Sequence, residues 1–551
     1  MPNISGNAVE VDEPNMAKDT NLSALGILVL VFFFWGFIAA GNGIFIPFCK
    51  HFFELDQFQS QLIDFAFYTA YYFGALVLFI VTTITKKDLI GIWGYKNSII
   101  FGLLFSAIGA LVMILAVQNK EFIGMLTGLF MVALGFSLQQ TAANPFAILL
   151  GNPKTGADRV NLGGAVNSLG TTIGPLVIAF ALFGSTESLS DDQIAHLDLN
   201  KVTWMYSIVA LLFVVAALVF VSSKKVPSGK YTEAIVPASR ALMLMLFMSG
   251  FLMICFAFVF DTYKSTTSLE SDQLEFQRIS WLIAALLGII GILLFTLKAS
   301  KSNALSWGAM QFPQLILGML GVFVYVGVEV SIGSNLGELL KNEEFGGFQA
   351  SEIAPFISMY WGSLMIGRWA AAVHVFKLKP LLKKVALITV PLLAFMVIIA
   401  ANVVAKKNVD HLWAYIVLVF IQILGFLFTG NNPNRALLVF SIFGMTSLLV
   451  GLNSSGITTV YAFLAGGLAC SIMWPAIFSM SLMGLGKYTA QGSAFLIMMI
   501  LGGGVIPPIQ GKLADIVGIH QSYWLALLAF GYLAFFAIRV PAILRKQSII
   551  E

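Results

Sequence analysis

Charged residues are scarce in this chain. Asp, Glu, Lys and Arg make up 11% of its 551 residues, against roughly 25% in an ordinary soluble domain. A water-soluble globule of this length needs more polar surface, so most classes of soluble protein are excluded. Disorder is excluded too, because 48 Phe and 50 Gly accompany a formal net charge of only +4, whereas disordered chains are poor in aromatics and strongly charged. That small, unclustered charge gives no indication of nucleic-acid binding.

Cysteine is rare as well. The three cysteines, Cys49, Cys255 and Cys470, lie in or beside apolar stretches without a CxxC motif, and a single His, His51, lies close to one of them, two residues after Cys49. The sequence therefore predicts neither a disulfide framework nor a metal site. It also lacks a P-loop, an HExxH motif and a GxSxG motif, so we expect no direct use of ATP, no cofactor and no enzyme activity.

Long apolar runs dominate what remains. Hydrophobic residues make up 58% of the chain, and its mean hydropathy is +0.89. A helix that crosses a membrane needs about 20 mostly apolar residues, and sixteen stretches satisfy this requirement. They are 25–48, 61–83, 97–117, 121–150, 160–184, 203–222, 239–260, 280–297, 310–335, 353–375, 381–404, 412–429, 435–452, 457–482, 489–511 and 521–543. The sequence thus predicts an all-α polytopic membrane protein with about 16 spans.

The distribution of positive charge predicts the orientation. If the N-terminus is cytoplasmic, the segments on that side hold 21 Lys and Arg residues and the outside loops hold 9. Because Lys and Arg are retained on the cytoplasmic side, we expect an even number of spans with both termini in the cytoplasm. The polar residues 1–23 do not resemble a cleavable signal peptide, so we expect a cytoplasmic tail on a protein of the inner membrane.

Similar short motifs that contain proline or glycine recur in the same order in two parts of the chain. Pro145 in the fourth stretch corresponds to Pro475 in the fourteenth, and Pro175 in the fifth to Pro508 in the fifteenth. FFFWGF in the first stretch matches FVYVGV in the ninth, and AFYTAYYFGAL in the second matches ISMYWGSLMIG in the tenth. An internal duplication of this kind is typical of transporters.

The repeat predicts two six-helix bundles and two inserted helix pairs. The expected parts are a cytoplasmic tail at 1–23, an N-terminal bundle at 24–223, a linker with the first inserted pair at 224–305 and a C-terminal bundle at 306–551. The second inserted pair lies within 381–452. We favour 435–452 as the bundle span of that region, because Asn432-Pro433-Asn434-Arg435 makes a compact turn before it.

Several stretches resemble the fucose–galactose–glucose symporter family of the major facilitator superfamily. In the first half these are FFFWGFIAAGNGIFIPF, LIDFAFYTAYYFGAL, GFSLQQTAANPFAILLG and RVNLGGAVNSLGTTIGP. In the second half they are FVYVGVEVSIGSNL, MYWGSLMIGRW, CSIMWPAIFSMSLMGLG and GGGVIPPIQGKLAD. The resemblance covers both bundles. It implies the major facilitator fold and sugar uptake by alternating access, normally driven by protons.

Three positions depart from the pattern of that family. The aspartate of the first span and the glutamate before TAANPF, which carry the proton in the family, are Gly43 and Gln140 here. A glutamine of the NLxx stretch is Gly164. Neither Gly43 nor Gln140 can titrate, so the usual route of proton coupling is in doubt. The missing volume at Gly43 and Gly164 leads to the hypothesis of a substrate larger than a plain hexose.

Three ionisable side chains inside predicted spans are candidates for function, because a charge within the membrane costs about 2.5–3.5 kcal/mol and therefore faces a cavity or a partner. Glu329 is central in its span and is a candidate ligand for the coupling cation or the sugar; the alternative is a hydrogen-bonded structural group. Asp64 is a second coupling-ion candidate, or a carboxylate that complements a helix dipole. We expect Arg368 to form a structural or gating salt bridge.

Neutral polar and aromatic residues are the better sugar ligands, since amides both donate and accept hydrogen bonds. Gln140 and Asn144 are four residues apart and share a helix face. The candidates for substrate contact are Gln140, Asn144, Asn167, Asn42, Tyr68, Glu329, Tyr360 and Trp474. For each aromatic ring, plain helix packing is the alternative. Pro145 and Pro475 are expected to bend their helices beside the cavity.

The sequence therefore predicts a secondary active sugar transporter, with a sugar, H⁺ or Na⁺ and the lipid bilayer as partners. One alternative is an uncoupled facilitator. Another is a transport-dead membrane sensor or assembly partner, which the lost carboxylates and the four additional spans would fit. An intramembrane enzyme is disfavoured, because no nucleophile lies near a base in the sequence.

Overall fold

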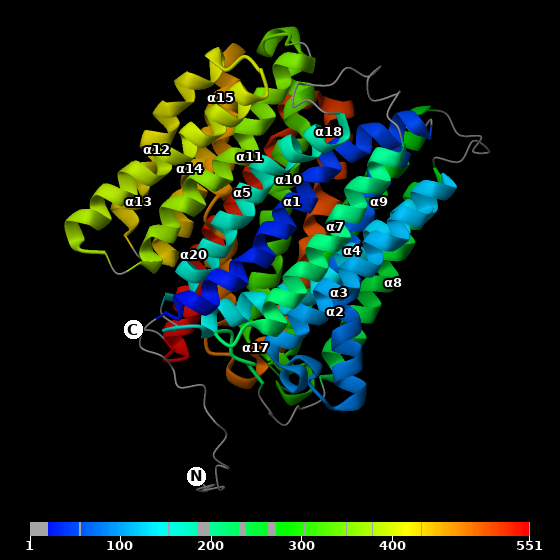
Figure 1. Ribbon diagram of the computed structural model, residues 1–551, viewed down its shortest axis with the longest axis vertical. Coiled ribbons are helices and arrows are strands. Elements are labelled where there is room, and N and C mark those ends of the chain that lie inside the picture. Colours follow the sequence, from blue (N-terminus) through cyan, green and yellow to red (C-terminus); the bar gives the residue numbers. More distant parts are fainter. Residues whose placement is uncertain are drawn as a thin grey trace, which may run out of the picture.

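The computed structural model describes residues 20–53, 57–152, 155–183, 199–230, 238–262, 271–301, 304–348, 350–376, 378–430 and 432–549. These residues form helices and no strand, in agreement with the all-α prediction (Figure 1). The first helices are α1 (Leu22–Phe52), α2 (Gln57–Thr85), α3 (Leu89–Asn119), α4 (Phe122–Leu149), α5 (Gly156–Phe183), α7 (Leu199–Ser222), α8 (Ser239–Asp261) and α9 (Ser271–Ala299). The remaining helices are α10 (Pro313–Lys341), α11 (Ala350–Ala372), α12 (Pro380–Val404), α13 (Ile416–Thr429), α14 (Pro433–Leu452), α15 (Gly456–Cys470), α16 (Met473–Leu482), α17 (Thr489–Met498), α18 (Gly502–Val517), α19 (Ile519–Ser522) and α20 (Trp524–Lys546).

Each of the sixteen predicted spans coincides with a helix or with two consecutive helices. Among the described residues, fourteen helical segments are long and apolar enough to cross a membrane. The helices α5 and α11 are not among these fourteen, and both carry several polar side chains. The chain is thus a multi-pass membrane protein, and the count of about 16 spans stays a prediction.

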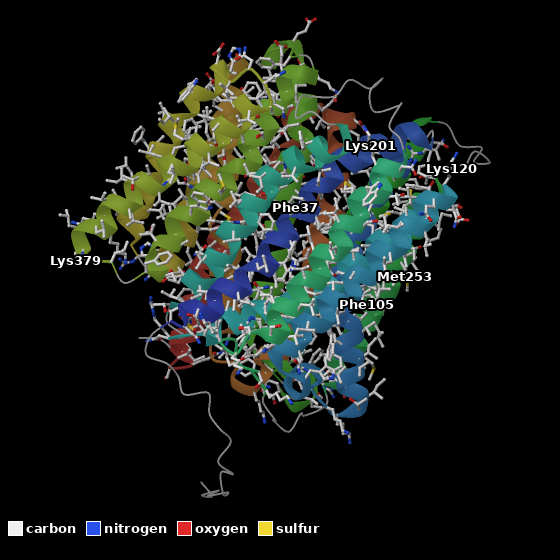
Figure 2. The ribbon with its side chains drawn as sticks, in the orientation of Figure 1. Phe37, Phe105, Lys120, Lys201, Met253 and Lys379 are labelled. Carbon is white, nitrogen blue, oxygen red and sulfur yellow. The ribbon has the colours of Figure 1, made fainter. Side chains whose placement is uncertain are left out.

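Apolar side chains cover the outside of the helices between their ends. Phe105 and Met253 are examples, with 38% and 59% of their surface exposed, and Figure 2 shows both on the outer face of the bundle. Lys120 and Lys201 lie near one end of the molecule in the same view. An apolar belt with charged residues beyond it is the surface expected of a protein surrounded by lipid.

Two sets of helices pack in the same way. In the first set, α1 lies against α5, α2 against α4, and α3 against both α4 and α7. In the second set, α10 lies against α18, α11 against α15, and α14 against both α15 and α20. The helix α14 therefore holds the position in the second set that α3 holds in the first. The helices α12 and α13 lie outside this arrangement, α12 against α11 and α13 between α12 and α14, at the left edge in Figure 1.

The other additional pair, α8 and α9, contacts both sets. The hydroxyl of Tyr72 in α2 is 2.9 Å from the Ser249 hydroxyl of α8 and donates a hydrogen bond of 3.1 Å to the Met245 carbonyl. On the other side, α9 packs against α18, and Glu275 of α9 forms an ion pair with Lys512 of α18. This pair therefore bridges the first and second sets.

One end of the molecule, called here the termini end, is the end at which α1 begins and α20 ends (Figure 1, lower part). The Asn21 amide donates to the carbonyl of Leu150 at 2.9 Å, so α4 ends there. Gln314 Nε2 donates to Gln547 Oε1 at 3.0 Å, so α10 begins there. The two sets meet toward this end, where α17 packs against α2 and α4 and α11 packs against α5.

A fully buried arginine fixes the corner between α4 and α5. Arg159 donates to the carbonyls of Ala147, Ile148 and Asn152 and to the Thr155 hydroxyl, three of these at 2.7–2.8 Å. The last carbonyls of a helix have no partners within the helix, and a cation there also complements the helix dipole. Arg159 therefore joins the end of α4 firmly to the start of α5.

The two predicted helix breakers behave differently. The stretch 457–482 is interrupted between α15 and α16, a few residues before Pro475. By contrast, α4 runs from Phe122 to Leu149 with Pro145 inside it. The stretch 489–511 is also interrupted, by a short 3₁₀ turn at Met499–Leu501 between α17 and α18.

Candidate functional site

Glu329 of α10 and Arg368 of α11 form an ion pair. Arg368 Nη2 lies 3.6 Å from Glu329 Oε1, and only 10% and 13% of the arginine and glutamate side-chain surfaces are exposed. Removing two charges from water is costly even when they are paired, so such a pair within membrane helices is a candidate functional position. The structure thus brings together a predicted coupling residue and a predicted gating residue.

Arg368 also connects the two sets of helices. Its Nη2 donates to the Tyr325 hydroxyl at 3.2 Å, and its Nε donates to the Ser471 carbonyl at 3.3 Å. Its Nη1 donates to the Ser168 hydroxyl at 2.8 Å and to Asn167 Oδ1 at 3.4 Å. Since Asn167 and Ser168 belong to α5 of the first set, one guanidinium spans the boundary. A planar fork with five fixed N–H groups is suited to this task.

A glycine of α5 leaves room for the arginine. A Cβ atom at Gly164 would lie 3.2 Å from Arg368 Cδ and 3.6 Å from its Nε. The volume that the sequence analysis assigned to a larger substrate is therefore taken by the Arg368 side chain, which corrects that part of the hypothesis. The surroundings of Gly43 lie outside the described side chains.

Gly164→Gln, which introduces the residue of the family pattern, is expected to lower the thermal unfolding temperature in detergent. The longer side chain displaces Arg368, and overpacking of this kind costs roughly 1–3 kcal/mol. Gly337→Ala in α10 is the matched control, because its Cβ would meet neighbouring atoms only at 3.6–3.7 Å. Equal unfolding temperatures for the wild type and Gly164→Gln would contradict this use of the glycine.

Two aromatic candidates surround the ion pair in different ways. Tyr360 is fully buried, and its hydroxyl donates to the backbone carbonyl of Glu329 at 2.6 Å. In this conformation it fixes α11 to α10 and offers no exposed ring face. Trp474 is partly buried, with its ring centroid 6.2 Å from that of Tyr325. Trp474 remains a candidate for stacking on a sugar ring.

Gln140 and Asn144 lie one turn apart on α4, as expected. Gln140 is partly exposed, and its Nε2 donates to the Tyr71 hydroxyl at 3.3 Å. Asn144 is buried; its Nδ2 donates to the Gln140 carbonyl at 3.0 Å, and its Oδ1 has no partner among the described residues. Of the two amides, Gln140 has the more accessible side chain.

Tyr68 of α2 lies at the boundary between the two sets. A Cβ atom at Gly503 of α18 would be 3.1 Å from a Tyr68 ring carbon, and one at Gly504 would be 3.6 Å from Tyr68 Cβ. The absence of side chains at these two glycines lets the ring approach the backbone of α18. Tyr68 thus stands where the first and second sets touch.

The other predicted ligands have less direct evidence. Asn167 donates through Nδ2 to the Phe32 carbonyl at 3.0 Å and accepts from Arg368, so protein groups occupy both ends of its amide. Asn42 and Asp64 belong to α1 and α2, but their side chains lie outside the described residues. Their assignments stay predictions.

Pro145 leaves a carbonyl free for a contact between the sets. Proline has no N–H, so the carbonyl four residues earlier lacks its helical donor. In α4 this is the carbonyl of Thr141, which accepts a hydrogen bond of 3.0 Å from the Ser493 hydroxyl of α17. Pro145 therefore contributes to the contact between α4 and the second set without interrupting α4.

Pro475 has the equivalent effect in the second set. The carbonyl four residues before it is that of Ser471, which accepts the Nε–H of Arg368. Ser168, Ser471 and Ser493 are not recognisable as site residues from the sequence, because small hydroxyl residues are common between membrane helices and carry no signal of their own. Ser168 could have been suspected because it follows Asn167 directly. Ser471 could have been suspected because it lies four residues before Pro475.

The part of the chain that the structure describes contains no group of three or more His, Cys, Asp or Glu residues that could hold a metal ion. The chemistry available at the site is therefore that of one buried acid, one arginine, amides and aromatic rings. Such a site can bind polar hydroxyl groups and a single cation.

Known transporters resemble this chain in sequence and in fold. No family model matches the chain. The chain is similar to the glucose/galactose transporter of Brucella abortus, with 28% identity over 515 residues, covering 94% of this chain and 93% of the relative. It is 26% identical over 529 residues to the putative glucose/galactose transporter of Helicobacter pylori, covering 95% and 98%. The solved structure of the Escherichia coli fucose:proton symporter matches with a TM-score of 0.60 and 20% identity, covering 95% of this chain and 99% of that chain.

These matches define the class of protein. The fold is that of the major facilitator superfamily. The resemblance to the fucose–galactose–glucose symporters is confirmed. The relatives are named as transporters or symporters rather than enzymes, as the sequence predicted.

Proposed function

We propose that this chain is a secondary active transporter that moves a sugar across the cytoplasmic membrane by alternating access, with uptake coupled to a cation. The names of the relatives support the substrate class, since they refer to glucose, galactose and L-fucose, the last together with protons. The sugar and the cation, H⁺ or Na⁺, are the small-molecule partners.

The two moving parts are the bundles 24–223 and 306–551, with helix pairs inserted at 224–305 and within 381–452. The repeated packing supports this division, because α1 with α5 corresponds to α10 with α18, and α3 with α7 corresponds to α14 with α20. The excess of Lys and Arg supports a cytoplasmic location for both termini. The termini end, at which the two sets meet, is then the cytoplasmic end.

The Glu329–Arg368 ion pair carries the proposal of coupling. The carboxylates that couple sugar to proton in the family pattern are replaced by Gly43 and Gln140. Glu329 is a largely buried carboxylate that contacts, through Arg368, the helix α5 of the other set. A cation that neutralises Glu329 weakens its hold on Arg368 and changes the contact between the sets. A ligand that interacts differently with two conformations shifts the equilibrium between them, which is the requirement for coupling.

The test is uptake by proteoliposomes that contain the purified chain. Labelled glucose, galactose, L-fucose, N-acetylglucosamine and a disaccharide are each offered under an inward H⁺ gradient, an inward Na⁺ gradient and no gradient. We expect at least one sugar to accumulate above equilibrium under one gradient, and no uptake by protein-free liposomes. Accumulation of a monosaccharide that no disaccharide inhibits would also exclude the larger substrate.

An uncoupled sugar facilitator is the second candidate. The loss of both family carboxylates favours it, and so does the existing arginine partner of Glu329. In that case sugar equilibrates across the membrane and both gradients are without effect. Sugar binding without any flux would instead identify a membrane sensor.

A further inference from the structure

The additional helices α12 and α13 are attached to the second set by buried polar side chains. Asn402 at the end of α12 donates through Nδ2 to the Ser358 hydroxyl of α11 at 2.9 Å. Tyr415, immediately before α13, donates to the Leu464 carbonyl of α15 at 2.9 Å, and its hydroxyl lies 2.8 Å from the Ser363 hydroxyl of α11. Polar groups buried in an apolar surrounding are retained where they have partners, so these contacts fix the pair against α11 and α15.

The third attachment, Gln422 in the middle of α13, reaches the arginine site. Its Nε2 donates to the Leu468 carbonyl at 3.2 Å and to the Ser471 hydroxyl at 3.1 Å. A Cβ atom at Gly367 would lie 2.6 Å from Gln422 Nε2 and even closer to Ser471 Oγ. Because position 367 has no side chain, both groups lie against α11 at the residue immediately before Arg368.

Both polar groups of Ser471, its carbonyl and its hydroxyl, accept hydrogen bonds from side chains of other helices. It lies at the interruption between α15 and α16, and its carbonyl is the one that Pro475 leaves without a helical donor. That carbonyl accepts from Arg368, and the hydroxyl of the same residue accepts from Gln422. A continuous series of contacts therefore runs from α13 through Ser471 and Arg368 to Glu329.

We propose that the helix pair α12–α13 holds the coupling site in place, with Gln422 as the positioning residue that fixes the acceptor of Arg368. This inference rests on the function proposed above, and it assigns a role to helices that lie outside the two six-helix sets. The amide acts through Ser471 and Arg368 and touches neither sugar nor cation. Without it, Arg368 has a less well-defined position between Glu329 and α5, and cation binding is less well linked to movement.

The side chain of Gln422 has a second property that makes it a good test position. Its Oε1 is buried without a partner among the described residues. An unsatisfied buried acceptor opposes folding, so this glutamine is not optimised for stability alone. Gln422→Met keeps a similar length, removes the donor that Ser471 uses and also removes the unsatisfied oxygen. We therefore expect this variant to fold.

The experiment compares Gln422→Met with Asn402→Leu, which removes a buried amide of the same helix pair whose partner, Ser358, lies ten residues before Arg368 on α11. For Gln422→Met, gradient-driven accumulation should fall at least about fivefold, the lower end of the range for coupling between two binding sites. Sugar exchange without a gradient should remain near the wild-type level. In Asn402→Leu the two activities should change by the same factor.

Hydrogen–deuterium exchange of the same samples gives a readout that does not need transport. We expect faster exchange in the segment 471–478 for Gln422→Met and no such increase for Asn402→Leu. Equal behaviour of the two variants in both measurements would overturn the positioning role. If the wild type does not accumulate sugar under either gradient, the proposed coupling fails; exchange at 471–478 then decides the role of Gln422 alone, faster exchange supporting it and unchanged exchange overturning it.

Discussion

Glu329→Gln is expected to abolish cation-driven sugar accumulation while sugar exchange without a gradient persists. The amide keeps the shape of the side chain and can hydrogen-bond to Arg368, but it carries no charge and binds no proton. Accumulation should fall by roughly 100-fold, since coupling between two binding sites of one protein spans about 5- to 150-fold. The measurement is uptake of the transported sugar under the active gradient, with counterflow measured on the same proteoliposomes.

Glu338→Gln is the control for this experiment. Glu338 lies on the same helix, but it is exposed and pairs with Lys341 on the surface at 3.1 Å. An exposed pair of this kind contributes little, so both activities should stay at the wild-type level. If Glu329→Gln still accumulated sugar, Glu329 would be a structural residue and another group would carry the coupling ion.

Arg368→Gln is expected to have the largest effect on stability. Removal of one partner of a buried ion pair leaves the other charge without compensation, which costs about 3–5 kcal/mol. Glu329 would be that uncompensated charge. The measurement is the thermal unfolding temperature in detergent, which should fall clearly for Arg368→Gln. It should be largely restored in the double variant with Glu329→Gln, since neither charge then remains.

Arg368→Lys separates charge from geometry. Lysine keeps the positive charge near Glu329, but one ammonium group cannot replace a planar fork that reaches Tyr325, Ser168 and the Ser471 carbonyl together. We expect near-wild-type stability with accumulation lowered at least tenfold, the loss produced by about 1.4 kcal/mol. Arg435→Gln, at the exposed start of α14, serves as the control. Full accumulation by Arg368→Lys would show that the charge alone is sufficient.

The sequence was sufficient to predict the helices, since all sixteen apolar stretches coincide with helical segments. It was less informative about interruptions. Pro475 follows a break, whereas Pro145 sits inside a continuous α4, because neighbouring groups such as the Ser493 hydroxyl can satisfy a freed carbonyl and leave the helix intact. A single sequence does not reveal which prolines have such neighbours.

The site was predicted only in part, for a related reason. Glu329 and Arg368 stood out because charges are rare within spans, but their pairing did not follow from the sequence. Lipid and protein interior are both apolar, so a hydrophobic pattern does not reveal which face of a membrane helix meets another helix. The contact of Arg368 with Ser168 joins residues 200 positions apart. Gly164 was interpreted as free volume because the arginine that fills it comes from the other set.

The hydrogen bonds of Arg159 connect α4 to α5 and therefore affect how these helices separate from the second set. Because this arginine joins the end of α4 to the start of α5, we expect the two helices to move together. Both helices contact the second set, for example through Thr141 with Ser493 on α4 and through Ser168 with Arg368 on α5. If α4 and α5 move together, we expect these contacts to open together, which would disfavour half-open states that leak ions across the membrane.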